Sequence, residues 1–369
     1  MPLSGINVFE MAGLAPAPFA GLILADFGAN VIRIDKTESF NADVLNRNKR
    51  SIALDLKNKL SIETLLELFK KADVLLDPYR PGVMEKLGLG PDTLLKNNPR
   101  LIYARLSGYG QSGSTAAGHD INYLAISGAL SFMGRKSEAP FFPANMLADF
   151  AGGGLMCVMG ILMALFERTR SGLGQVIDAN LTAGTAYLAT FPYLMQKFGL
   201  IWEGKRGSNM LDGGAHFYET YQTKDGLYMA VGAIEPQFYA ALIGKLGLDQ
   251  ATLPNQMDRE TWPSMKKRFQ DIFLTKTQSE WTSIFEGSDA CVTPVLSFND
   301  TKDHTAPPQP APILHRTPAI KSTSADTDLD HAFLEPGKNS MEVLLEFKIE
   351  ENLIRRLLAS GALKSKSML

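Results

Sequence analysis

Strand-like and helix-like segments alternate over the first 110 residues, and this alternation limits the possible folds more than any other feature of the chain. The apolar segment GINVFEMAG is followed by APFAGLILADFG, which has proline near its start and ends at Gly28, and then by VIRID. Proline is favoured in the first turn of a helix and glycine just after its end, so these residues predict a strand–helix–strand unit. The alternation continues to LIYARLSGYG at residues 101–110. A parallel sheet with helices on both faces is the simplest fold that it allows.

The pattern changes after residue 200, where the polar, glycine-rich segment WEGKRGSNMLDGGA precedes HFYETYQTKDGLYMAVGA. The second of these segments predicts a hairpin that turns at Lys224, Asp225 and Gly226. A proline-rich segment at 306–312 is typical of an extended linker. We expect a large α/β domain over 1–200, a linker over 201–214, a small α+β domain over 215–299, a second linker over 300–312, and a segment, 313–369, that returns to the large domain.

Composition and residue spacing exclude several classes of function. The formal net charge of −2 and the pI of about 6.3 argue against a nucleic-acid-binding protein. The two cysteines, Cys157 and Cys291, are too few for a disulfide framework, and the five histidines lack the spacing of metal ligands. The uncharged run from Phe150 to Phe166 has seventeen residues, the short limit for a membrane span. Its four glycines favour a buried helix in close packing, so we expect no membrane span.

The segment from Gly108 to Gly113 matches the G-x-G-x-x-G fingerprint of dinucleotide sites. A loop follows it, however, where that fingerprint requires a helix, and the turn after the first predicted strand lacks the fingerprint as well. We therefore expect no nicotinamide site here. The glycines would instead let the backbone pass close to a ligand or to His119.

Acid–base chemistry is indicated by three residues in apolar, glycine-rich surroundings, His119, Asp149 and Glu235. Asp120 and Asp149 each precede an apolar helical segment, so both are predicted N-caps, where backbone amides and the helix dipole also favour a bound anion. An imidazole titrates near neutral pH and a half-buried carboxylate can be tuned towards it, so this set could transfer protons. The alternative is that the aspartates only cap their helices.

Basic residues near the predicted strand ends of the first domain could bind a polyphosphate such as the nucleotide of coenzyme A, because ligands of open α/β sheets bind at the carboxyl edge of the strands. An ordinary surface rich in lysine and arginine is the alternative. The residues concerned are Lys36, Arg47, Lys49, Arg50, Lys57 and Arg80.

Longer motifs carry a family resemblance. They include LAPAPFAGLILADFGANVIRID, RLIYARLSGYGQSG, GHDINYLAISGAL, LADFAGGGLMCVMGILMALFERTRSGLGQVIDA and VGAIEPQFYAAL, in this order. Over roughly residues 1–300 the chain resembles the class III CoA-transferase family, and within it the branch of α-methylacyl-CoA racemases. The resemblance implies an interlocked homodimer in which each chain has a Rossmann-like large domain and a smaller domain, with the active site where the two meet.

The resemblance also implies roles for the three acid–base residues. In the transferase branch the aspartate at the position of Asp149 is a nucleophile, whereas in the racemase branch it is an acid–base residue partnered by the histidine of GHDINY and supported by the glutamate of IEPQF. The chain has His119 and Glu235 in these motifs. This implies racemisation of 2-methylacyl-CoA thioesters through an enolate, with His119 and Asp149 flanking the α-carbon and Glu235 orienting His119. A CoA-transferase with Asp149 as nucleophile is the alternative, and a non-enzymatic CoA-binding role is the third possibility.

Coenzyme A would enter as part of the substrate and not as a separate cofactor. By the same resemblance it would contact Lys36, Leu54, Asp55, Leu56, Lys57, Gly118, Asp120, Ile121, Asn122 and Tyr123, with Arg80 as a further contact. The racemase branch has arginine where Lys36 stands, so a bidentate contact to phosphate would be lost.

The last three residues, Ser367, Met368 and Leu369, resemble the S-K-L peroxisomal signal with methionine in place of lysine. A peroxisomal location is therefore expected, with mitochondrion and cytoplasm as alternatives.

Overall fold

The computed structural model describes residues 1–37, 43–300, 308–323, 326, 328 and 332–364. The chain divides into two compact units. The first unit comprises Met1–Ser127, Pro143–Leu188 and Thr305–Leu369, and the second comprises Gly128–Phe142 and Ala189–His304. The second unit thus includes a segment, 128–142, that the predicted division gave to the large domain, and it resumes at residue 189 instead of near 200.

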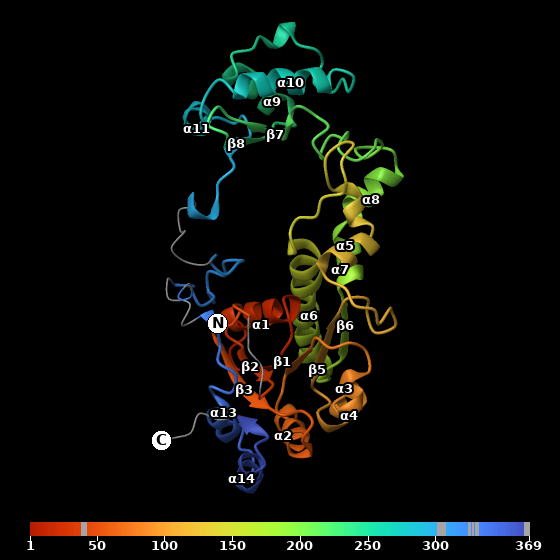
Figure 1. Ribbon diagram of the computed structural model, residues 1–369, viewed down its shortest axis with the longest axis vertical. Coiled ribbons are helices and arrows are strands. Elements are labelled where there is room, and N and C mark those ends of the chain that lie inside the picture. Colours follow the sequence, from red (N-terminus) through yellow and green to blue (C-terminus); the bar gives the residue numbers. More distant parts are fainter. Residues whose placement is uncertain (38–42, 301–307, 324–325, 327, 329–331, 365–369) are drawn as a thin grey trace. The chain divides into compact units, whose positions relative to one another are not determined.

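A seven-stranded sheet forms the centre of the first unit (Figure 1). Its strand order is β10-β3-β2-β1-β4-β5-β6, and every neighbouring pair is parallel except β10 with β3. The strands are β1 (Asn7–Met11), β2 (Asn30–Asp35), β3 (Lys49–Leu54), β4 (Val74–Asp77), β5 (Ile102–Ser107), β6 (Val176–Asn180) and β10 (Leu363–Lys364). The predicted α/β class with a largely parallel sheet is confirmed.

Successive strand residues point into two separate cores, one on each face of the sheet, because side chains alternate along a strand. Phe9 and Ile32 belong to one core and their neighbours Val8 and Val31 to the other. The first core is covered by α2 (Lys59–Phe69), α3 (Val83–Lys86), α4 (Pro91–Asn97), α13 (Ser340–Glu346) and α14 (Glu351–Ala359). The second is covered by α1 (Pro16–Asp26) and α6 (Met156–Ser171).

The C-terminal segment completes one edge of this sheet, where β10 pairs with β3. The backbone N–H of Ser51 donates to Asn339 Oδ1 at 3.1 Å, and the Arg50 guanidinium bonds Glu342 and Glu346 at 2.6 Å each. Figure 1 shows α13 and α14 beside this edge. Residues far apart in sequence therefore form one sheet and one core.

The second unit contains a three-stranded antiparallel sheet, β7-β8-β9, which confirms a smaller α+β part. Its core is aromatic and includes Phe217, Tyr221, Phe269 and Phe273. Its strands are β7 (Tyr218–Gln222), β8 (Tyr228–Gly232) and β9 (Val292–Pro294). Its helices are η1 (Ala129–Phe132), α8 (Thr190–Lys197), α9 (Pro236–Lys245), η3 (Gln250–Thr252), α10 (Trp262–Phe273), α11 (Gln278–Phe285) and η4 (Phe298–Asp300).

Polar contacts explain why the segment 128–142 belongs to this unit. Arg135 forms an ion pair with Glu219 at the start of the sheet, and Arg206 donates to the backbone carbonyl of Glu138. Such contacts between residues some 70–85 positions apart carry no periodic signal in the sequence.

Two helical segments differ from prediction. The helix expected directly after Asp149 begins as a π-helix, η2 (Met146–Leu155), and continues as α6. The single helix expected over 181–199 is two helices, α7 (Leu181–Leu188) and α8, separated at Ala189. Pro192 lies in the first turn of α8, where proline is tolerated, whereas inside a continuous helix its ring would clash with the carbonyl of Leu188.

Among the described residues, the helical run Met146–Ser171 is long and apolar enough, by length and composition, to cross a membrane. A core helix of a globular protein passes the same test, and 39% of the most apolar window of this run is buried. Cys157, Ile161 and Ala164 on this run pack into the core of the first unit. Those contacts are the ones expected of a core helix.

Candidate active site

A pocket of about 540 Å³ lies at the carboxyl edge of the seven-stranded sheet. Its lining comes from loops that follow β1, β4 and β5, including Leu14, Arg80 and Gly108, and from Leu181 after β6. The chain passes outward from β1 to β2 and β3 in one direction and to β4 and β5 in the other. Loops at such a reversal of strand order diverge and leave a crevice, which is the usual ligand site of an open α/β sheet.

His119 lines this pocket from the start of α5 (Asp120–Ile126). It occupies the N-cap position with extended backbone, φ −130° and ψ 178°, and its backbone N–H donates to Asn122 Oδ1 at 3.1 Å. The prediction that Asp120 caps this helix is therefore wrong by one residue. The shift places the imidazole, and not the carboxylate, at the mouth of the helix.

Asp120 instead joins α5 to η2. Its carboxylate is only 3% exposed, and Oδ2 accepts the backbone N–H groups of Ala148 and Asp149 at 2.7 and 2.8 Å. The amides in the first turn of a helix lack partners within the helix and attract a carboxylate, so this contact is favourable. Because Asp120 occupies them, these two amides are not available for a substrate oxyanion, contrary to expectation.

Asp149 is the fourth residue of η2 and lines the same pocket as His119. It is not the N-cap, which is Asn145; the Asn145 side-chain amide donates to Asp149 Oδ2 at 3.4 Å. Burial raises the pKa of Asp149, the Asn145 hydrogen bond lowers it, the negative charge of Asp120 raises it, and His119 lowers it. The net direction is upward, which favours the protonated acid.

The glycine-rich turn at 108–113 serves side-chain packing. A Cβ atom at Gly108 would lie 2.2 Å from the Tyr123 ring, and one at Gly113 would lie 1.9 Å from the Tyr109 carbonyl oxygen. Tyr109 and Tyr123 pack edge to face with ring centroids 5.1 Å apart. The Tyr123 hydroxyl donates to the Gly118 carbonyl at 2.5 Å, next to His119. The turn therefore fits two tyrosines beside the pocket, and no helix follows it as a dinucleotide site requires.

The predicted coenzyme A contacts separate into two groups. Arg80, Gly118 and Tyr123 line the pocket. Lys36 follows β2, and residues 55–57 follow β3, so they lie along the same carboxyl edge of the sheet but outside the pocket lining. Ile121 and Asn122, on α5, are also outside the pocket lining. The side chains of Leu54 and Asp120 are buried, so a contact from either residue would have to come from its backbone.

Three of the six basic residues do not form the expected polyphosphate surface. Lys49 and Arg50 begin β3 and so lie at the opposite edge of the sheet. Lys49 Nζ pairs with Glu10 Oε2 at 2.8 Å, both side chains being fully buried, and it also donates to a backbone carbonyl. Arg47 pairs with Asp26 at 2.6 Å. Arg47, Lys49 and Arg50 are thus structural ion-pair partners.

Glu235 belongs to the second unit and precedes Pro236 at the N-terminus of α9. Because Glu235 and His119 belong to different units, the hydrogen bond expected between them remains a prediction. Across the described residues, no three His, Cys, Asp or Glu side chains are grouped as metal ligands would be.

Asn145 and Tyr109 are among the pocket residues that sequence reasoning missed. Asn145 precedes Asp149 by four positions, a spacing that places side chains on one helical face and could have revealed it. Tyr109 is recognisable only once the packing of the glycine turn is known.

Comparison with known proteins places the chain in a family. Residues 3–309 match the profile of the family described as CoA-transferase family III. The chain is 52% identical to the alpha-methylacyl-CoA racemase of Mus musculus over 385 residues, and 53% identical to that of Homo sapiens over 386 residues; each alignment covers 100% of this chain and 99% of the relative.

A solved structure agrees at the level of the fold. The crystal structure of a CAIB/BAIF family protein from Brucella suis superimposes with a TM-score of 0.76 at 21% identity, over 94% of this chain and 99% of that one. The family profile spans most of the chain, and the relatives span all of it. The chain therefore belongs to CoA-transferase family III.

Proposed function

We propose that the protein interconverts (2R)- and (2S)-2-methylacyl-CoA thioesters, acting as a racemase. The observation that carries this proposal is that a histidine and a carboxylic acid of raised pKa, His119 and Asp149, line one pocket. The mouse and human alpha-methylacyl-CoA racemases, which match the chain end to end, support the same reaction.

In the proposed mechanism the thioester carbonyl acidifies the α-hydrogen. Neutral His119 removes this proton from one face of the α-carbon and leaves a planar enolate. Protonated Asp149 then delivers a proton to the opposite face, which inverts the centre. The reverse reaction starts from imidazolium and carboxylate, so the pair shares one proton in both directions. Burial of Asp149, by raising its pKa, helps it to hold that proton.

The enolate oxygen needs hydrogen-bond donors. Since the amides of Ala148 and Asp149 already bond Asp120, we assign this role to the backbone amides of Asp120 and Ile121, which directly follow the pocket residue His119 although neither residue is part of the pocket lining. They lie in the first turn of α5, directly after His119, where no intrahelical acceptor exists. The positive end of the helix dipole would add to their effect.

Coenzyme A would be held along the carboxyl edge of the sheet. Arg80 in the pocket is suited to a phosphate, and Lys36 and Lys57 follow the adjoining strands β2 and β3 at the same edge. In this proposal coenzyme A is part of the substrate, and neither a separate cofactor nor a metal takes part.

A homodimer is part of the proposal. On α6, Met159, Leu162, Met163 and Phe166 are 42–66% exposed, and their spacing places them on one face of the helix. This face of α6 is therefore exposed in the single chain, although the run Phe150–Phe166 was expected to form a buried helix. Apolar faces of this kind are typical of surfaces that associate. The proposed peroxisomal location rests on Ser367, Met368 and Leu369, which lie outside the described residues.

A deuterium-exchange experiment tests the proposal. A (2R)-2-methylacyl-CoA incubated with the protein in heavy water should acquire deuterium at the α-carbon and become a mixture of both epimers. His119→Ala and Asp149→Ala should each lose most of this activity, because each face needs its own acid or base. The loss should be about 10²–10⁴-fold, the usual contribution of a general acid or base.

The alternative is a CoA-transferase in which Asp149 attacks the thioester. Its position in the pocket would also serve that reaction. Transfer of coenzyme A to an added carboxylic acid, with full retention of the α-hydrogen, would establish the alternative and refute the racemase. Normal exchange in both alanine variants would refute the roles assigned to His119 and Asp149, and a parent protein that shows neither exchange nor transfer would refute both enzymatic proposals.

A further inference from the structure

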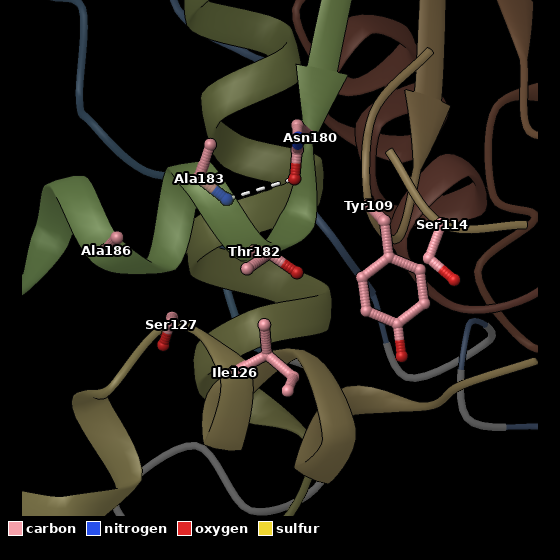
Figure 2. Close-up of a pocket in the computed structure, with 8 residues that line it drawn as sticks. All are labelled: Tyr109, Ser114, Ile126, Ser127, Asn180, Thr182, Ala183 and Ala186. Carbon is pink, nitrogen blue, oxygen red and sulfur yellow. Dashed lines mark hydrogen bonds between the residues drawn. The ribbon is translucent and has the colours of Figure 1, made fainter. Parts of the chain in front are cut away.

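A second pocket of about 540 Å³ adjoins the candidate active site in the first unit (Figure 2). Tyr109 and Ser114, from the loop after β5, line both pockets. The opposite wall of the second pocket is formed by Ile126 at the end of α5 and by Ala183 and Ala186 on α7. The two pockets are therefore neighbours that share Tyr109 and Ser114 as a common wall.

The lining of this second pocket carries no ionisable carboxylate, lysine or arginine. Four of its polar side chains form hydrogen bonds to nearby backbone. Thr182 Oγ1 donates to the Gly108 carbonyl at 2.8 Å, Ser127 Oγ donates to the Leu124 carbonyl at 2.8 Å, and Asn180 Oδ1 accepts the Ala183 N–H at 3.0 Å. Ser114 Oγ accepts the Ala116 N–H at 3.1 Å. With these bonds made, most of the surface offered to a ligand is methyl, methylene and aromatic, and the Tyr109 hydroxyl and the Asn180 amide group are its main polar groups.

The position of the pocket relative to His119 suits an alkyl chain. His119 stands at the start of α5 and Ile126 ends it, so the two residues are separated by the length of a seven-residue helix, about 10 Å. Ile126 is 70% exposed, which is a poor position for an isoleucine unless an apolar group covers it. A chain attached to the reacting carbon at His119 and directed past Tyr109 would cover it.

We propose that this second pocket holds the distal part of the substrate's acyl chain and sets the preference for chain length. The proposal rests on the proposed function, since the occupant is the alkyl tail of the same thioester. Each methylene buried against Ile126, Ala183 and Ala186 adds to binding, whereas a short acyl group would end before Tyr109 and gain nothing from the pocket.

Filling the pocket tests this assignment. Ala186 is exposed on α7, so Ala186→Phe adds a ring to the pocket without entering a core. The probes are 2-methylhexadecanoyl-CoA and 2-methylbutanoyl-CoA, each followed by α-deuterium incorporation. We expect kcat/KM for the long thioester to fall about fifteen- to sixtyfold, the equivalent of two or three methylenes, and kcat/KM for the short one to change less than about twofold.

A second variant and a matched control complete the test. Ile126→Gln removes apolar surface at an exposed position and should lower kcat/KM for the long thioester alone. Ala125→Phe, also exposed on α5 but outside the pocket, should leave the ratio of the two substrates unchanged. An equal effect on both substrates, or no effect on either, would overturn the assignment. Such an outcome would leave the proposed function intact as long as the parent protein exchanges the short thioester. A parent protein that exchanges neither thioester would refute the proposed function itself.

Discussion

Asp120 shows how a residue outside the proton-transfer chemistry can determine it. Its buried carboxylate bonds the first turn of η2, which carries Asp149, and its own neighbour in the chain is His119. Its negative charge also raises the pKa of Asp149, although burial is the largest cause of that increase. One side chain therefore holds the proposed acid in position and also contributes to its affinity for a proton.

Asp120→Asn should weaken two charge-assisted hydrogen bonds and lower the free energy of unfolding by about 1–3 kcal/mol. It should also remove a charge that raises the pKa of Asp149, so the acid limb of the kcat/KM profile should move to lower pH. Urea unfolding and racemisation rates measured from acid to neutral pH check the two effects. Asp92→Asn, at an exposed first-turn position of α4, is the matched control and should change stability by less than about 0.5 kcal/mol. An unmoved acid limb in Asp120→Asn would contradict the electrostatic part.

His216 gives a second prediction at this scale. Burial lowers its pKa to about 4 from 6.5, while Nε2 pairs with the Tyr239 hydroxyl at 2.9 Å. The folded state therefore binds the proton less tightly than the unfolded chain. Stability is complete above pH 6.5 and declines as the pH falls from 6.5 towards 4, by up to ~3 kcal/mol. His216→Gln, which cannot titrate, should lack this decline.

Tryptophan fluorescence can follow the unfolding of the second unit selectively, because all three tryptophans of the chain belong to this unit. They are Trp202, Trp262 and Trp281. Unfolding curves of the parent and of His216→Gln at pH 7 and pH 4.5 make the comparison. Parallel losses of stability in the two proteins would show that His216 is not the cause.

The proposed acid–base residues illustrate what the sequence could and could not predict. His119 and Asp149 were identifiable because each stands before an apolar helical segment. Their helix-end positions were predicted one to four residues away from those observed, since Asp120 bonds another helix and not its own. A cap within a helix is a local feature, whereas a carboxylate that bridges residues 28–29 positions apart leaves no local pattern.

At the scale of elements, η2 and α7 pack with almost no side chain between them. A Cβ atom at Gly184 would lie 1.9 Å from the backbone oxygen of Gly152, and one at Gly152 would lie 2.4 Å from Thr185 Oγ1. Two glycines thus let the backbones touch three residues after Asp149. Because the obstruction at Gly184 is backbone, a rotamer change cannot relieve it.

Gly184→Ala should therefore displace η2, lower the free energy of unfolding by at least about 2 kcal/mol, and reduce racemisation by misplacing Asp149. Gly244→Ala on α9 is the matched control, since a Cβ atom there meets nothing within 4 Å. In a helix this change should be neutral or stabilise by up to about 1 kcal/mol. Thermal unfolding of the two variants decides the point. Equal melting temperatures for both would contradict close backbone packing at Gly184.

Elements governed by local pattern were predictable, and those governed by contacts were not. The strands and helices of residues 7–107 follow from apolar runs with proline and glycine at helix ends, and the structure confirms them. The π-helical start of η2 was not foreseen, because it depends on Asp120 and on the glycine contact with α7. Similarly, the sequence shows the charge of Lys49 but not its buried ion pair with Glu10, so Lys49 was wrongly assigned to a basic surface.

At the scale of the whole molecule, the exposed apolar face of α6 is the surface that favours association with a second copy of the chain. Met163→Glu places a charge at a 58% exposed position in the middle of this face. If the face joins two copies of the chain, the variant should dissociate at concentrations at which the parent is dimeric, since a buried unpaired charge costs several kcal/mol. Light scattering coupled to size-exclusion chromatography measures the mass directly.

Leu345→Glu on α13 provides the control, being an exposed apolar residue, 61% accessible, on another helix of the first unit. It should leave the mass unchanged. A parent that is monomeric throughout, or a Met163→Glu variant that keeps the parent's mass, would remove the support that this face gives to a homodimer.

The pairing of β10 with β3 has a consequence for biosynthesis. The sheet edge at β3 and the core beneath α13 and α14 are made from residues near both ends of the chain. A ribosome must therefore finish almost the whole polypeptide before that layer can close, whereas every residue of the second unit has emerged earlier. Until then Leu54, Ile52 and their neighbours stay uncovered on one side, which makes nascent chains of this protein natural clients for chaperones.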